Sequence, residues 1–220
     1  LLRTRPKGPL LRGVPMQQFD HAVVYVPAQS GIARGFFVDS TAEALDLDAL
    51  RQDDAGAEAL VLNPATGDHA WREIPFRPAR ENTQQLKAKL RLAPDGEAEG
   101  RVTLQARGWM GSRLRRLARN PQAMEQAMQA LSARLFSGAA VRRAEAEEVT
   151  RLDRPARLGV ELEIPALGRR EGRQLRLRIP PAWSPKTAFQ LKDRRHPLVM
   201  GVPRTYRFST EVELTAGLGV

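Results

Sequence analysis

Apolar and polar residues alternate along much of the chain from about residue 83 onward. In "LKAKLRL" (residues 86–92), leucine and alanine occupy every second position, and lysine and arginine lie between them. The pattern returns in "GRVTLQARG" (100–108), "LGVELEIP" (158–165), "GRQLRLRIP" (172–180) and "RTYRFSTEVELT" (204–215). A period of two predicts strands with one buried and one solvated face. The turn signal "PDGE" (94–97) predicts that the first two strands form a hairpin.

One segment of helical spacing interrupts this alternation, at residues 121–137. Asn120 suits the N-cap, Pro121 the first helical position, and Gly138 the C-terminal stop. The apolar residues share one face, which assigns the methionines to the core rather than to a ligand site: Met124, Ala127, Met128, Leu131 and Leu135. We therefore expect residues 81–220 to form an antiparallel, β-sandwich-like domain with one inserted helix.

The first 80 residues have a less regular pattern. A loop is expected over residues 1–18, followed by strands at 20–26 and 35–39 that are joined by the turn-rich segment "PAQSGIARG". Ser40 or Thr41 could cap a helix, and a further short strand is expected at 59–62. A domain boundary is predicted near residues 80–83, so the chain as a whole is expected to be mainly β (α+β).

Composition narrows the possible functions. The chain has 220 residues, with 42% hydrophobic and 27% charged residues, and no apolar run approaches the roughly 18 residues of a membrane helix. It opens on "LLRTRPKGPL" without an initiator methionine or a recognisable signal peptide. We expect it to be a piece of a longer protein.

The net charge of +10 would attract nucleic acid. The arginines, however, are spread over the chain among acidic residues, and aromatic residues make up only 5%, so we do not expect nucleic acid as a partner. The chain has no cysteine, which excludes disulfides, thiolate metal sites and a cysteine nucleophile within it. With three histidines, a multi-histidine metal site is not expected, and we expect no cofactor.

Two ionisable residues lie beside the first two predicted strands: His21 in "FDHAVVYVP" (19–27) and Asp39 in "FFVDSTAEAL" (36–45). If Val26 faces Arg34, then His21 faces Asp39 with Cβ atoms about 5 Å apart. A carboxylate there would fix the imidazole tautomer and leave its other nitrogen free. A register slip of one residue would separate the two, and a purely structural histidine is the competing interpretation. No third catalytic residue is evident.

The segments "LLRTRPKGPL", "QQFDHAVVYVP", "GFFVDSTAEAL" and "ALVLNP" resemble the C-terminal half of a bacterial transglutaminase-like core. In that family an "FDHA" or "FNHA" segment carries the catalytic histidine, and a "DxT" segment carries the catalytic aspartate. The resemblance implies the β half of a papain-like fold over residues 1–80 and a Cys–His–Asp mechanism. In that mechanism His21 is the base, Asp39 orients it, and the cysteine lies upstream of these residues. Over residues 81–220 the resemblance is looser and includes "RRHPLVMGVP" (194–203).

Two other histidines compete with His21 for the catalytic role. "DHAWREI" (68–74) resembles the "HAW" segment of many transglutaminase cores, but no "DxT" follows His69 at hairpin distance. His196 is flanked by arginine and proline and is expected in a loop. We favour His21 over both as the catalytic histidine.

The resemblance implies acyl transfer or hydrolysis at glutamine or peptide carbonyls, by an enzyme of which this chain is an inactive C-terminal fragment. The implied partners are a protein or peptide substrate and the missing N-terminal part of the same protein. An extracytoplasmic setting in a bacterium is also implied. The alternative is a non-catalytic binding or scaffold module that recognises peptide or cell-envelope material.

Overall fold

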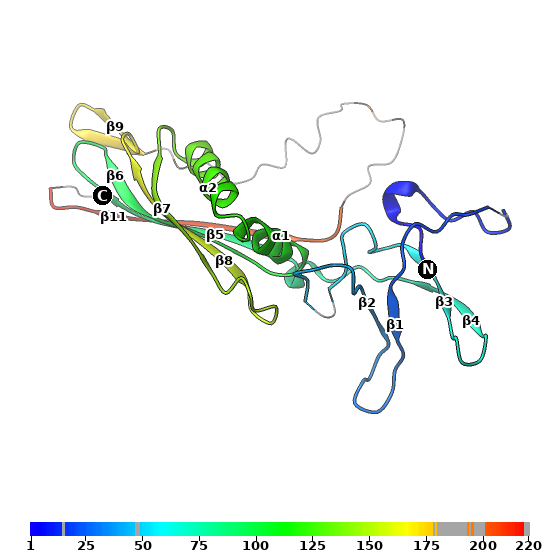
Figure 1. Cartoon of the computed structure of the whole chain (residues 1–220). Helices are drawn as coiled ribbons and strands as arrows, with labels where there is room; N and C mark the ends of the chain where they lie inside the picture. The colour runs from blue at the N-terminus through cyan, green and yellow to red at the C-terminus, as the bar shows by residue number, and fades with distance from the viewer. Residues whose placement is uncertain are drawn as a thin grey trace.

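The computed structural model describes residues 1–14, 16–46, 49–177, 179, 193, 195 and 201–217. Strands account for 38% of these described residues and helices for 16%, so this part of the protein is mainly β, as the alternation predicted. Figure 1 shows a long sheet with two helices against it and, beside one end of the sheet, a smaller group of hairpins that contains the N-terminus. We call residues 1–82 the N-terminal region and residues 83–217 the sheet region.

The sheet region is built on one five-stranded sheet in the order β11-β5-β6-β8-β7. Its strands are β5 (Thr83–Leu92), β6 (Ala98–Ala106), β7 (Ala140–Glu147), β8 (Ala156–Ile164) and β11 (Thr205–Leu214). The pairs β5–β6, β6–β8 and β7–β8 are antiparallel, whereas β11 runs parallel to β5. The sheet is therefore mixed rather than antiparallel throughout, because the alternation of side chains does not determine strand direction.

Two helices, α1 (Trp109–Ala118) and α2 (Pro121–Leu135), pack on one face of this sheet (Figure 1). The helix expected over 121–137 is present as α2 and ends at Leu135, and the Asn120 side chain caps it by accepting a 3.0 Å hydrogen bond from the Ala123 amide. Helix α1 was not predicted. Its sequence, "WMGSRLRRLA", mixes glycine, serine and three arginines with its apolar residues, and its buried side includes Gly111, Ser112 and Arg115, which a search for apolar spacing does not find.

The two faces of the sheet differ sharply. The helix-covered face holds a continuous buried core from β5, β6, β8 and both helices, with Leu158 and Val160 at 0% exposure. The opposite face carries ion pairs between strands, including Arg101 with Glu145 and Glu161, and Lys89 with Glu211. The sandwich expectation was wrong: among the described residues, helices cover one face, and charged side chains on the other keep it in water.

The N-terminal region consists of short elements: η1 (Arg5–Lys7), β1 (Val24–Val26), β2 (Phe36–Val38), β3 (Glu58–Leu62), β4 (His69–Glu73) and η2 (Ala79–Glu81). β1–β2 and β3–β4 are separate antiparallel pairs, and β9 (Gly168–Glu171) pairs with β10 (Gln174–Leu177) in the sheet region. Leu2, in the segment expected to be a loop, is fully buried and bridges to His21 and Ala59. It thereby joins the two N-terminal hairpins through their backbones.

The prediction of a helix that begins at Ser40 or Thr41 was wrong. In this part of the chain, the described residues form turns at 40–45 and 52–56. Thr41 does not cap a helix; its amide and hydroxyl bind the side chain of Asp39 instead. Such a local side-chain turn competes with helix formation. No helix among the described residues is long and apolar enough to cross a membrane.

Candidate functional site

His21 lies just before β1, where backbone hydrogen bonds hold it against the first residues of the chain. The Leu2 amide donates to the His21 carbonyl at 2.9 Å, and the His21 amide donates to the Leu2 carbonyl at 3.2 Å. The preceding residue is fixed as well, because the Asp20 carboxylate accepts 2.7 Å hydrogen bonds from the amide and the hydroxyl of Thr4. These hydrogen bonds fix the backbone at His21, and only 11% of its side chain is exposed.

Asp39 directly follows β2, and its side chain is fully buried. Its Oδ1 accepts hydrogen bonds from the Thr41 amide (2.9 Å) and hydroxyl (2.7 Å), and its Oδ2 lies 3.1 Å from Nε2 of His21. Burial alone would raise the pKa of Asp39. The hydrogen bonds from Thr41 and His21 outweigh burial, so the pKa is held below its usual value and the carboxylate is the stable form.

The expected contact between His21 and Asp39 is present, but the register that predicted it was wrong. Strand β1 pairs Val26 with Phe36 rather than with Arg34, a shift of two residues. A shift of two keeps side chains on the same face of a sheet and turns a directly opposed pair into a diagonal one. The contact therefore survives because both side chains still project to the same side.

A third ionisable residue, Asp54, joins this pair. Its Oδ2 lies 3.8 Å from His21 Nε2, its exposure is 0%, and neither of its oxygens accepts a hydrogen bond from a described residue. Burial raises the pKa of Asp54 to about 6. We did not predict this residue. In "RQDDAG" (51–56), only the fold shows that Asp53 faces Arg51 while Asp54 faces inward.

Arg51 places a positive charge beside the cluster. Its guanidinium hydrogen-bonds to Asp53, which is the main cause of its raised pKa, and it also interacts electrostatically with Asp54 and Asp39. The Asp53 carbonyl accepts a 2.9 Å hydrogen bond from the Arg5 amide, which ties this loop to η1. The acidic pair thus has a cation nearby, although that cation is hydrogen-bonded to a different carboxylate.

The two nitrogens of His21 have different surroundings. Nε2 faces both carboxylates, and it is Nε2 rather than Nδ1 that hydrogen-bonds to a described side chain. A neutral imidazole with its proton on Nε2 can donate to Asp39 and keep Nδ1 as a base. Nε2 and one oxygen from each of Asp39 and Asp54 also lie within 4.8 Å of one another, which is close enough for a shared metal ion.

Among the described residues, the other histidine, His69, is not part of this cluster. His69 is exposed at the start of β4, where it pairs with Leu62. Two residues later, Trp71 stacks on Phe19 at 6.4 Å between ring centroids, so the "HAW" segment packs beside the "FDHA" segment without bringing its own histidine to the acidic cluster. His196 lies outside the described residues.

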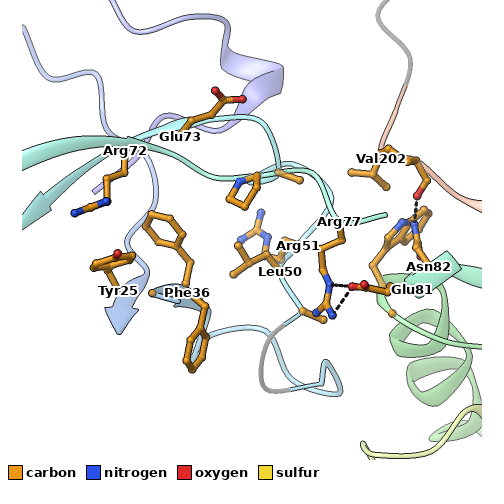
Figure 2. Close-up of a pocket in the computed structure, with 18 of the residues that line it drawn as sticks. Tyr25, Phe36, Leu50, Arg51, Arg72, Glu73, Arg77, Glu81, Asn82 and Val202 are labelled. Atoms are coloured by element: carbon orange, nitrogen blue, oxygen red, sulfur yellow. Dashed lines mark hydrogen bonds and ion pairs between the residues drawn. The ribbon is translucent and has the colours of Figure 1, made fainter. Parts of the chain in front are cut away.

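A cavity of about 570 Å³ lies between the N-terminal region and the start of α1 (Figure 2). Its walls combine aromatic rings with arginines: Tyr25, Phe36, Phe37, Trp71 and Trp109, and Arg51, Arg72 and Arg77. Arg77 is paired with Glu81 at 2.8 Å, and Arg72 lies over the Tyr25 ring at 4.9 Å. Arg51 lines this cavity and also interacts with the acidic cluster.

Comparisons with protein-family models, with curated proteins and with solved structures found no match to this chain.

Proposed function

We propose that this chain supplies the base and the orienting carboxylate of a cysteine-dependent acyl-transfer site of the transglutaminase-like, papain-like kind. The observation that carries the proposal is the 3.1 Å contact between His21 Nε2 and Asp39, which leaves Nδ1 outside that hydrogen bond. The nucleophile has to come from outside these 220 residues, because they contain no cysteine.

The proposed reaction starts when Nδ1 of His21 takes the proton of the thiol. The thiolate then bonds to the carbonyl carbon of a glutamine carboxamide or a peptide. The carbon–nitrogen bond breaks, and the leaving amine or ammonia carries away the proton held on Nδ1. A second amine or water, deprotonated by His21, attacks the thioester and restores the thiol. Asp39 stabilises the imidazolium formed in each half.

The setting of Asp39 supports this role. In "Asp39-Ser40-Thr41", both hydrogen bonds from Thr41 go to Oδ1, which leaves Oδ2 for the imidazole. A carboxylate fixed in this way holds the imidazole in one orientation and one tautomer. In the "DxT" pattern on which the resemblance is based, the threonine therefore holds the aspartate side chain in place by two hydrogen bonds.

The test is amine incorporation into a glutamine-containing protein, together with peptide cleavage, by the product of the complete reading frame that encodes these residues. His21→Ala should lower kcat/KM by about 10²- to 10⁴-fold, the usual contribution of a general base. His69→Ala is the matched control and should leave it unchanged, because His69 is exposed in β4.

Any of three results would contradict the proposal. The protein encoded by the complete reading frame could contain no cysteine, its activity could survive His21→Ala, or the 220-residue chain could be active alone. The last should not occur, since this chain has no thiol.

A second candidate function, a binding module for peptide or cell-envelope material, is favoured by the aromatic cavity. Aromatic walls with a few charged groups are typical of ligand sites. Trp71→Ala should then weaken binding of peptide or cell-wall fragments to the chain, measured by calorimetric titration, while His21→Ala leaves it unchanged. Equal binding by the Trp71→Ala variant would exclude this cavity as the binding site.

A further inference from the structure

We propose that His21, Asp39 and Asp54 together bind one divalent transition-metal ion, through Nε2 of the imidazole and one carboxylate oxygen from each aspartate. The site needs no thiol and so does not depend on the acyl-transfer proposal.

The distances between the three side chains fit a shared ion. Nε2 of His21 lies 3.1 Å from Asp39 Oδ2 and 3.8 Å from Asp54 Oδ2, and the three ligand atoms all lie within 4.8 Å of one another. Ligands around a tetrahedral Zn²⁺ lie about 3.3 Å apart, because each bond is about 2.0–2.1 Å long. Asp39 Oδ2 is already near that spacing from Nε2, and Asp54 Oδ2 is about 0.5 Å beyond it. The two carboxylate oxygens lie within 4.8 Å of each other and would draw together around the ion.

Asp54 provides the independent reason to expect a ligand. It is fully buried, it points at Nε2, and neither of its oxygens accepts a hydrogen bond from a described residue. A buried carboxylate without a partner is costly. Arg51 is near, but its guanidinium hydrogen-bonds to Asp53. An ion between the two buried aspartates would compensate both charges and give Asp54 the partner it lacks.

The donor set selects the kind of metal. One imidazole nitrogen with two carboxylates suits zinc, manganese or ferrous iron, whereas Ca²⁺ and Mg²⁺ prefer oxygen ligands alone. The His21 side chain is 11% exposed and both aspartate side chains are fully buried, so a water that completes the coordination would approach from the imidazole side. Because the ion would occupy Nε2, the imidazole would carry its proton on Nδ1. Metal binding and the proposed base role therefore exclude each other, and Zn²⁺ would act as an inhibitor.

The test is calorimetric titration of Zn²⁺ into the 220-residue chain, in a buffer free of chelators. We expect one ion per chain, with affinity reduced at least tenfold by Asp54→Asn and by His21→Gln. The matched controls are Asp68→Asn and His69→Ala, an exposed aspartate and histidine in and beside β4, which should leave the affinity unchanged. Zn²⁺ should also raise the unfolding temperature of the wild type and not that of Asp54→Asn.

Three results would overturn the proposal: no binding at millimolar Zn²⁺, undiminished binding by Asp54→Asn, or binding lost on His69→Ala. Far-UV circular dichroism establishes that each variant is folded, and Asp39→Asn replaces any ligand variant that is not. The titrated chain has no cysteine. The result of the Zn²⁺ titration therefore does not depend on the result of the acyl-transfer assay.

Discussion

The two regions of this protein differ in how they use buried residues. In the sheet region, alternating apolar residues of three long strands and two helices form one continuous core. In the N-terminal region, the strands are three to five residues long, and the buried core cluster consists of Leu2, Phe37, Ala57, Ala59 and Ile74. Buried polar groups such as Thr4, Asp39 and Asp54 lie beside that small core. We infer that the sheet region supplies most of the free energy of unfolding. The N-terminal region holds the candidate functional side chains.

The difference also shows what holds the candidate site in place. His21, Asp39 and Asp54 lie at strand ends and in turns, positioned by hydrogen bonds from Leu2 and Thr41 rather than by a regular ladder. Precise placement in a short, loop-rich region therefore depends on a few polar contacts. Small changes to those contacts should alter the site while the sheet remains folded.

The largest effect should come from Leu158→Ala in the centre of the sheet. Leu158 is fully buried in β8, and its truncation leaves a cavity that costs about 2–5 kcal/mol of the free energy of unfolding. Leu62→Ala is the matched control, because Leu62 at the end of β3 is 53% exposed and should cost less than about 0.5 kcal/mol. Urea denaturation measures both. Similar losses for the two variants would contradict the burial of Leu158 in a continuous core of the sheet region.

Asp54→Asn should stabilise the protein at neutral pH. The pKa of Asp54 is about 6 when folded, against 3.8 for the free side chain, so between these values the folded state keeps a proton that the unfolded state has lost. The free energy of unfolding therefore falls as pH rises through this window. Removing the carboxylate should raise the free energy of unfolding by on the order of 1–3 kcal/mol at pH 8. At pH 3, where the carboxyl is protonated in both states, the increase should be small.

Urea denaturation across this pH range, without added metal, measures the effect of Asp54→Asn. Asp68→Asn, at an exposed aspartate, is the control and should show no such difference. A loss of stability in Asp54→Asn at pH 8 would mean that the surroundings of Asp54 stabilise its charged form, which contradicts a pKa raised by burial.

A smaller effect is expected from Thr41→Val. It removes the hydroxyl that donates to Asp39, costing about 1 kcal/mol at neutral pH. Asp39 has a lowered pKa, so its contribution to stability is present above the unfolded pKa and is lost as pH falls through the folded one. The difference between Thr41→Val and wild type should therefore shrink in acid.

The control for Thr41→Val is Thr66→Val, which removes the same kind of bond, to Asp68, on an exposed turn and should cost less than about 0.5 kcal/mol. Equal losses in the two threonine variants would show that burial of Asp39 does not strengthen its hydrogen bonds.

The regular parts of the fold were readable from the sequence. A period of two indicates β5, β6 and β8, and Asn120 with Pro121 marks the start of α2. The parallel placement of β11 beside β5 was not readable, because alternation says nothing of strand order or direction. Strand β7 was also missed, since three of the four apolar residues in "AVRRAEAE" at the sheet edge are alanines, which favour strands weakly.

The candidate site was only partly predictable. His21 and Asp39 could be proposed because each lies at the end of an apolar run in a short hairpin. Asp54 could not, because two adjacent aspartates in a loop look alike until the packing of η1 and Arg51 shows which one is buried. The burial of one polar side chain depends on the whole fold, which local pattern does not reveal.

The most direct test of the central claim is the tautomer of His21, measured by long-range ¹H–¹⁵N correlation in the 220-residue chain without metal, at a pH where the imidazole is neutral. We predict a proton on Nε2, donated to Asp39, and an unprotonated Nδ1 free to act as a base. A proton on Nδ1, or a spectrum that Asp39→Asn leaves unchanged, would contradict the assignment of His21 and Asp39 as a catalytic pair.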